Sequence, residues 1–221
     1  LVFPLWSLIC GNATVFHGDA STHYAPQKAL QATMIRQGIA PTWDPFLNLG
    51  EPMAGNPALG TFYPPTVLAH LFFPVGWALS LSLAFHILML GIGAWAWIVS
   101  RTGRGWAGAI GGLACGLSGV ALSYTTNPQY LFTLSWLPWV LLLAERTGTT
   151  GRRIPAIATG CALGFAVHGG DAQGAIVLAI LAALWITWNA KYSGHGFGRG
   201  LRSTCLVAFV TIAIAAATAA S

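Results

Sequence analysis

The segment that decides the fold is residues 17–74, which contains HGDASTHYAPQ (17–27) and PTWDPFLNLGEPMAGNPALGTFYPP (41–65). It is polar and rich in proline, and it holds three of the five acidic residues of the chain, whereas the sequence on both sides is strongly apolar. A loop of this length between two apolar runs usually carries function or is disordered. Its aromatic residues and prolines favour an ordered structure over a disordered tether.

The composition outside this segment is that of a membrane protein. Hydrophobic residues make up 55% of the chain, charged residues only 7%, and the mean hydropathy is +0.66. A soluble domain has roughly 25% charged residues, so this chain has too little polar surface to face water. We therefore predict an all-α, polytopic transmembrane helix bundle. Because the sequence begins at Leu1 and ends at Ser221 inside apolar runs, we expect it to be a piece of a longer polypeptide.

The apolar runs predict seven membrane spans, because a helical span needs about 20 mostly apolar residues. Residues 1–10 supply the outer end of the first span, residues 11–75 form a long, partly helical external loop, and residues 76–221 contain six further spans. Those six are expected at 76–100, 106–126, 129–144, 154–168, 172–188 and 201–221, with Pro138 interrupting the fourth expected span.

Charged residues alternate between the loops and predict the topology. Every second loop is basic and holds Arg101, Arg104, Arg146, Arg152, Arg153, Lys191, Arg199 and Arg202. The other loops hold Asp19, Asp44, Glu51 and Asp171. Basic loops collect in the cytoplasm, so the 17–74 segment is predicted to lie outside. This topology accounts for the net charge of +5 without a nucleic-acid partner. The four isolated cysteines support neither a disulfide framework nor a zinc site and are expected to be buried.

Local signals predict two helices within the loop and close packing between spans. Pro26 and Gly38 bracket a helical pattern that is expected to lie along the membrane surface, with Lys28 and Arg36 away from its apolar side. Residues 65–73 are predicted to form a second such helix, while prolines and glycines between the two helices oppose regular structure. Small residues at four-residue spacing favour close helix packing, as in Gly108, Gly112, Gly116, Gly160 and Gly164.

The acidic residues of the outer loops are the candidates for chemistry. Asp19 and Asp171 are expected in one outward-facing cavity, where a carboxylate could act as a general base or, with others such as Asp44, bind a divalent cation. Lys28 or Arg36 could hold the phosphate of a lipid. Structural roles compete with these: Asp19 could cap a turn, Asp44 could initiate one, Asp171 could cap a helix, and Lys28 and Arg36 could contact anionic headgroups. We expect His70 and His86 to be satisfied by neighbouring helices.

An ordered series of dipeptides in residues 12–75 resembles the first external loop of the bacterial YfhO-like membrane proteins, of the GT-C superfamily of glycosyltransferases. The matching positions are Gly18-Asp19, Tyr24-x-Pro26, Gly38, Pro41-x-Trp43-x-Pro45, Gly50-x-Pro52, Asn56-Pro57 and Tyr63-Pro64. The HGGDAQ turn resembles a Gly-His-Pro-Gln-like turn of the family, with Asp171 and Ala172 in place of the usual pair. The resemblance implies an inverting transferase of the bacterial cytoplasmic membrane that uses a polyprenyl-phosphate-linked sugar, with its base or metal-binding carboxylate at Asp19.

The sequence therefore favours a GT-C-type transferase that delivers a sugar to a cell-envelope acceptor. Asp19 would be the base or metal ligand, Lys28 or Arg36 the phosphate contact, and Trp43 and Tyr63 aromatic platforms for a sugar or a headgroup. One alternative is a non-catalytic, GT-C-like subunit of a larger membrane assembly, with the aromatic loop as a docking surface. The other is a transporter, which normally needs ionisable groups near the membrane midplane.

Overall fold

The structure is a computed structural model of the chain, and it describes residues 18–194 and 196–219. The outer end of the first expected span, residues 1–10, and His17 lie outside the described residues. The described residues form fifteen elements in this order: η1 (Ala20–Tyr24), α2 (Ala25–Arg36), β1 (Trp43–Asp44), β2 (Glu51–Pro52), η2 (Pro57–Leu59), α3 (Pro64–Phe72), α4 (Val75–Thr102), α5 (Gly105–Gly116), α6 (Gly119–Ser123), η3 (Tyr124–Thr126), α7 (Pro128–Leu134), α8 (Leu137–Thr150), α9 (Arg153–His168), α10 (Ala172–Tyr192) and α11 (Phe197–Ala219).

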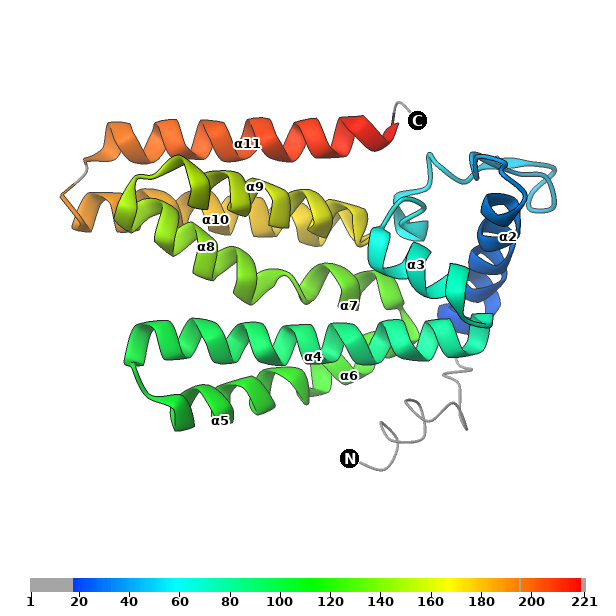
Figure 1. Ribbon diagram of the computed structural model, residues 1–221, viewed down its shortest axis with the longest axis horizontal. Coiled ribbons are helices and arrows are strands. Elements are labelled where there is room, and N and C mark those ends of the chain that lie inside the picture. Colours follow the sequence, from blue (N-terminus) through cyan, green and yellow to red (C-terminus); the bar gives the residue numbers. More distant parts are fainter. Residues whose placement is uncertain (1–17, 195, 220–221) are drawn as a thin grey trace.

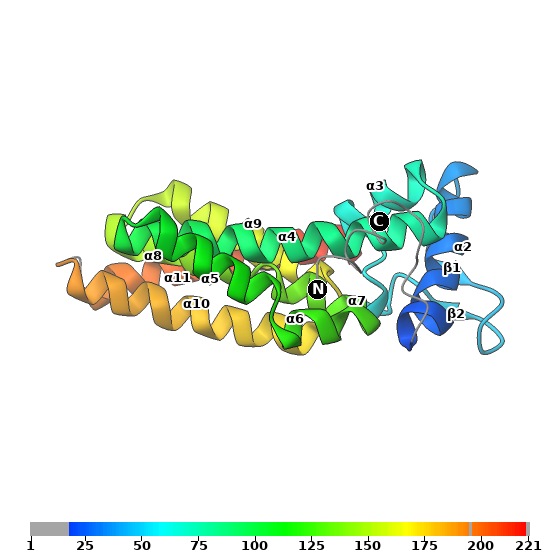
Figure 2. The ribbon, with the colours of Figure 1, turned by 90° about the horizontal axis from the view of Figure 1, so that it is seen from below.

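The long helices form an elongated bundle (Figure 1), which confirms the predicted all-α class. Within the described residues, four helical stretches are long and apolar enough to cross a membrane: Val75–Thr102, Gly105–Thr126, Ala172–Tyr192 and Gly198–Ala217. The C-terminal ends of α4, α8 and α10 lie at one end of the bundle, and α2 and the β1–β2 hairpin lie at the other (Figures 1 and 2). The basic and acidic loops are therefore at opposite ends, as their alternation predicts.

The expected third and fourth spans are each divided into shorter helices in the structure, the third into α5 and α6, and the fifth is a single short helix. The fourth is divided into α7 and α8 at Ser135 and Trp136, and Pro138 occupies the first turn of α8, where a missing amide hydrogen costs nothing. The interruption expected at Pro138 therefore occurs just before it. Helix α9 has 16 residues, which is below the length of about 20 that a straight span needs.

Glycines permit the closest helix contacts of the bundle, as the four-residue spacing predicts. A methyl group added at Gly112 of α5 would lie 2.7 Å from the carbonyl oxygen of Gly91 in α4. On the other side of the bundle, Gly160 and Gly164 of α9 face Val210 and Ile214 of α11. Two apolar clusters fill the interior, one around Leu83, Tyr63 and Phe132 near the hairpin end and one around Val140, Leu163 and Ile186 further along. Cys115 and Cys205 are exposed on the helix surfaces, so their expected burial is wrong.

The segment that precedes α4, residues 18–74, is called the outer segment below. Helix α2 runs across the end of the bundle, roughly perpendicular to α4 (Figure 1), and both α2 and α3 have the predicted bounds to within two residues. Between them the prolines and glycines do not exclude all regular structure, because Trp43 pairs with Pro52 and Asp44 with Glu51 in a minimal antiparallel hairpin. That hairpin extends beyond α2, away from the bundle (Figure 2).

Candidate functional site

The outer segment is held in place by the polar side of α2, which faces the protein interior. Gln27, Lys28 and Gln31 are all buried, whereas Thr33 is exposed and Leu30 is half-buried. The Nε2 atom of Gln27 donates to Oε1 of Glu51 at 3.1 Å, and Nε2 of Gln31 donates to the carbonyl oxygen of Thr61. The irregular loop leaves its carbonyl groups without ladder partners, and buried carbonyls require donors. The side chains of α2 supply them.

Lys28 is the centre of this arrangement and is not an exposed phosphate ligand. Its side chain has 0% exposure, and its Nζ atom donates to the carbonyl oxygen of Gly60 at 3.0 Å and lies 3.5 Å from Oγ1 of Thr66. Lys28 is therefore not available to the lipid phosphate that it was expected to contact. The buried side of α2 includes residues 24, 27, 28 and 31, which recur at helical spacing. The sequence predicts this side only if polar residues are accepted as buried.

Arg36 stays exposed at the other end of α2, where its guanidinium donates to the carbonyl oxygens of His70 and Leu71, both at 2.9 Å. A cation that binds the last carbonyls of α3 stabilises the C-terminus of that helix. With 12 residues at 1.5 Å each, α2 separates Arg36 from the Asp19 end by about 18 Å. Arg36 therefore cannot hold a phosphate that reacts at Asp19, although it can face a headgroup elsewhere.

Two of the acidic residues have structural roles in the hairpin. Asp44 is buried, and its Oδ1 accepts a hydrogen bond from the backbone amide of Phe46 at 2.8 Å, as expected of a turn initiator. The two carboxylate oxygens of Glu51 accept hydrogen bonds from Gln27 and from Asn48, each at 3.1 Å. These bonds hold the hairpin against α2 while its tip, with Asn48 and Leu49 both at positive φ, turns outward.

Asp171 is the N-cap of α10, which confirms the structural reading of this residue. Its Oδ1 accepts from the amide of Gly174 at 3.0 Å, and its own amide donates to Oγ1 of Thr133 at 3.2 Å. Thr133 also donates to the carbonyl oxygen of Ala166 at 3.0 Å. The α9–α10 turn is thereby fixed to α7, and Asp171 has one of its oxygens engaged by the helix that it caps.

Asp19 differs from these acids because its side chain is exposed and caps no helix end. It lines a small cavity of about 40 Å³ together with His23, Asn56, Ala58 and Gln129. The α9–α10 turn reaches the same place, since a methyl group at Gly170 would lie 2.8 Å from Cβ of Gln129 and 2.9 Å from the carbonyl oxygen of Ala58. The structure therefore brings Asp19 and the turn that carries Asp171 to shared neighbours, but Asp171 itself is not among the residues that line the Asp19 cavity.

Asp44 lies beyond Gln27, in a separate depression of about 230 Å³ that shares His23 and Gln27 with the Asp19 cavity. Asp19 and Asp44 thus line adjoining cavities, and Asp171 lines neither of them. In the described ranges, 18–194 and 196–219, no group of three or more histidines, cysteines or acidic residues is placed to hold a metal ion. The predicted divalent-cation site at Asp19, Asp44 and Asp171 therefore has no ligand set in this part of the chain.

Of the two predicted aromatic platforms, Trp43 is exposed and Tyr63 is buried. Trp43 is 51% exposed and rests its ring against Gly50 at the base of the hairpin, so it can still receive a ligand. Tyr63 has 0% exposure, and its expected role as a platform is wrong. Its Oη lies 2.8 Å from Nε2 of His86 and accepts from Nε1 of Trp136 at 3.0 Å.

Hydrogen bonds satisfy only one of the two histidines, His70 and His86, for which they were expected. His86 is satisfied at both ring nitrogens, since its Nδ1 lies 2.6 Å from the carbonyl oxygen of Ser82. His70 has one partner, the carbonyl oxygen of Thr66 at 2.8 Å from Nδ1, and its Nε2 is buried without a hydrogen bond.

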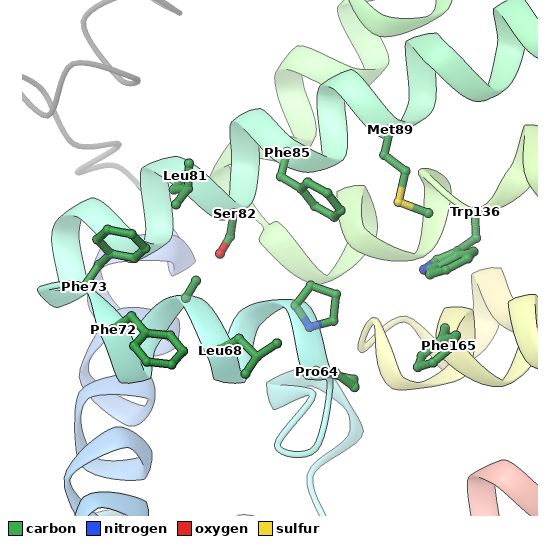
Figure 3. A pocket seen from close by; sticks show the side chains of 12 residues that line it. Pro64, Leu68, Phe72, Phe73, Leu81, Ser82, Phe85, Met89, Trp136 and Phe165 are labelled. Carbon is green, nitrogen blue, oxygen red and sulfur yellow. The ribbon is translucent and has the colours of Figure 1, made fainter.

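A large apolar groove was not predicted from the sequence. It is an apolar groove of about 570 Å³ between α3 and the first half of α4, closed at one end by Trp136 and Phe165 (Figure 3). Leu68, Phe72, Phe85 and Met89 line it, and Ser82 is the one hydroxyl on its walls. Apolar residues four apart on residues 64–72 were the available signal, but an apolar face on an interfacial helix is equally compatible with contact to the bilayer.

Asp19 and Trp43 thus remain available to a ligand near the hairpin end of the bundle, and Arg36 remains exposed at the other end of α2. The other expected site residues, Asp44, Asp171, Lys28 and Tyr63, are engaged within the protein. The groove adds an apolar binding surface at the same end. Comparisons of the chain with protein-family models, with curated proteins and with solved structures found no match.

Proposed function

We propose that the protein is an integral membrane, GT-C-like glycosyltransferase that moves a sugar from a polyprenyl-phosphate donor to a cell-envelope acceptor outside the membrane. The observation that carries the proposal is Asp19, an exposed carboxylate that caps no helix and opens into a cavity beside the α9–α10 turn. An exposed carboxylate that caps no helix is free to accept a proton from a bound hydroxyl. The resemblance of residues 12–75 to the YfhO-like proteins supports the same residue.

The proposed role of Asp19 is that of a general base. The acceptor hydroxyl oxygen forms a bond to the anomeric carbon of the sugar, and its proton passes to the Asp19 carboxylate. The bond from that carbon to the lipid phosphate breaks, and the phosphate leaves with the electron pair. Attack opposite to the leaving group inverts the configuration at the anomeric carbon. Positioned proton transfer of this kind contributes typically 10²–10⁴-fold to a rate.

The apolar groove supports a donor with a long hydrocarbon chain. Its walls are almost wholly aliphatic and aromatic, which suits a chain that gains free energy by leaving water or by packing against side chains. A second cavity of about 170 Å³, lined by Asn56, Phe62 and His168, lies between the loop and α9 and shares Asn56 with the Asp19 cavity.

The test compares Asp19→Asn with Asp171→Asn in proteoliposomes that contain radiolabelled polyprenyl-phosphate hexoses. Asn keeps the shape of Asp19 but cannot accept the proton, so transfer to the acceptor should fall at least 100-fold. Asn also serves as a helix cap, so Asp171→Asn should retain most of the activity at the same end of the molecule. Full activity of Asp19→Asn, with the protein inserted normally, would discard the assignment.

A non-catalytic subunit is the second candidate, and the hairpin tip favours it. Phe46 and Leu49 are 83% and 104% exposed, and Leu49 has a φ of 65°, a conformation that costs a non-glycine residue about 1–2 kcal/mol. Large apolar side chains held outward in this way suit a protein partner. Purification with a stoichiometric partner that is lost in Phe46→Ser/Leu49→Ser, together with unchanged behaviour of Asp19→Asn, would support this candidate over the transferase.

A further inference from the structure

Lys28 is a buried cation without an anionic partner. Its ammonium group has three donors, but it has one normal hydrogen bond, to Gly60, and a long contact with Thr66. The ring of Tyr24 is a further neighbour, with its centroid 5.4 Å from Nζ. The one ion pair within the described residues joins Arg101 and Glu145 at the far end of the bundle. A buried ammonium that is not paired is strongly disfavoured.

The side chains around Lys28 leave further polar atoms unmatched. Oε1 of Gln31 and Nε2 of His70 are buried and have no hydrogen-bond partner. Because Nδ1 of His70 contacts a carbonyl oxygen, which can only accept, Nδ1 carries the proton and Nε2 of the neutral ring is an acceptor. We call Tyr24, Lys28, Gln31, Thr66 and His70 the Lys28 cluster. Protonation of Nε2 would place a second positive charge in it.

No anion faces the Lys28 cluster from the described elements around it. Helix α3 contributes His70, η1 contributes the phenol of Tyr24, and the chain before α3 contributes the phenol of Tyr63. Burial raises the pKa of both phenols, so they remain neutral. Asp44 and Glu51 are engaged with hairpin groups and with Gln27, and Arg36, from α2 itself, is turned to the end of α3.

Burial lowers the pKa of Lys28 from its ordinary value of 10.5 to about 7, and it lowers the pKa of His70 to about 4. When Lys28 becomes exposed it regains the higher pKa, so the open state binds more protons at neutral pH. Stability of the segment therefore rises as the pH increases from about 7 to 10.5 and is lowest below 7. His70 acts in the same direction at lower pH, because its open form also binds a proton more readily.

We propose that the Lys28 cluster is a protonation switch that loosens the outer segment from the helix bundle when the pH outside the membrane falls. The contacts of Lys28 indicate which part of the protein the switch controls. Lys28 holds the carbonyl of Gly60, and Gly60 lies so close to the α9–α10 turn that a methyl group on it would be 2.6 Å from the His168 carbonyl oxygen. Ala58 and Leu59, next to Gly60, line the Asp19 cavity. Release of Lys28 therefore loosens one wall of that cavity, whatever reaction occurs there.

Hydrogen exchange of the protein in lipid nanodiscs tests the switch. After correction for intrinsic exchange, titration of Lys28 predicts about tenfold more opening of α2 and α3 at pH 6.0 than at pH 8.0, and His70 adds roughly a further fourfold. Helix α10 should show no such change. Lys28→Met should remove the tenfold component and leave the smaller one. Arg36→Met, which removes an exposed cation from the same helix, should keep the full pH dependence. A full pH dependence in Lys28→Met would overturn the proposal.

A measurement on the unaltered chain covers the case in which Lys28→Met does not fold. The chain has two lysines, the buried Lys28 and the exposed Lys191. Brief acylation with an amine-reactive ester labels Lys28 only when the segment opens, and Lys191 corrects for the pH dependence of the reagent. The ratio of Lys28 to Lys191 labelling, read by mass spectrometry, should rise at least tenfold from pH 8.0 to pH 6.0. A constant or falling ratio would refute the switch.

Discussion

Replacement of Tyr63 by Phe should destabilise the bundle, because a single hydroxyl satisfies two other buried groups. His86 accepts the Tyr63 proton at Nε2, since its Nδ1 donates to the carbonyl oxygen of Ser82. The same Tyr63 oxygen accepts from the indole of Trp136. The ring of Tyr63 stacks on Phe132, with 6.0 Å between centroids, and this contact is kept in the variant. The substitution therefore removes two hydrogen bonds and little packing.

The loss of stability depends on the buried groups that lose their hydrogen-bond partner. A buried group that loses its partner costs about 1–3 kcal/mol. His86 is fully buried, so its unpaired nitrogen carries the full cost. Trp136 borders the apolar groove, so its unpaired indole nitrogen costs less. We expect Tyr63→Phe to lower the free energy of unfolding by about 2–4 kcal/mol. His86→Leu in the Tyr63→Phe background should recover part of that loss, because removing both partners of a buried pair is nearly neutral.

Equilibrium unfolding in mixed micelles, followed by tryptophan fluorescence, measures these differences. Tyr130→Phe is the matched control, because Tyr130 is 39% exposed and its hydroxyl can be replaced by solvent. Tyr130→Phe should change the free energy of unfolding by less than about 0.5 kcal/mol. An equally small effect of Tyr63→Phe would refute the reasoning, since it would mean that His86 and Trp136 do not depend on the hydroxyl.

Two further substitutions test the helix contacts. Gly112→Ala should cost about 1–3 kcal/mol in the same unfolding assay, because the new methyl group would meet the carbonyl of Gly91 and force α4 and α5 apart. Gly105→Ala, where a methyl group meets no atom within 4 Å, should be neutral, and equal effects of the two would contradict close packing as the cause. Asp171→Ala should cost about 1 kcal/mol through loss of the bond to the Gly174 amide, and Asp171→Ser should restore most of it. If Ser and Ala behave alike, capping is not the role of Asp171.

Much of the bundle could be predicted because membrane spans are long and locally encoded. Apolar runs, the alternation of charge and glycines at four-residue spacing each need only neighbouring residues to be interpreted. The same holds for the ends of α2 and α3 at Pro26 and Pro74, and for the cap at Asp171. Predictions that required a side chain to be placed against a distant segment were less successful. Lys28 and Tyr63 were both expected at a surface and are both buried.

The sequence by itself determined the helical class, the opposite placement of basic and acidic loops and the position of the two helices in the outer segment. Only the tertiary structure decided which side of α2 is buried. The proline-rich and glycine-rich loop cannot pair its own polar groups. Lys28 and Gln31 are therefore buried where they donate to its carbonyl oxygens, and Gln27 where it donates to the Glu51 carboxylate, against their usual preference for solvent. That demand comes from residues some 30 positions away in the chain, so the helical spacing of residues 24, 27, 28 and 31 does not by itself show that this polar side is the buried one.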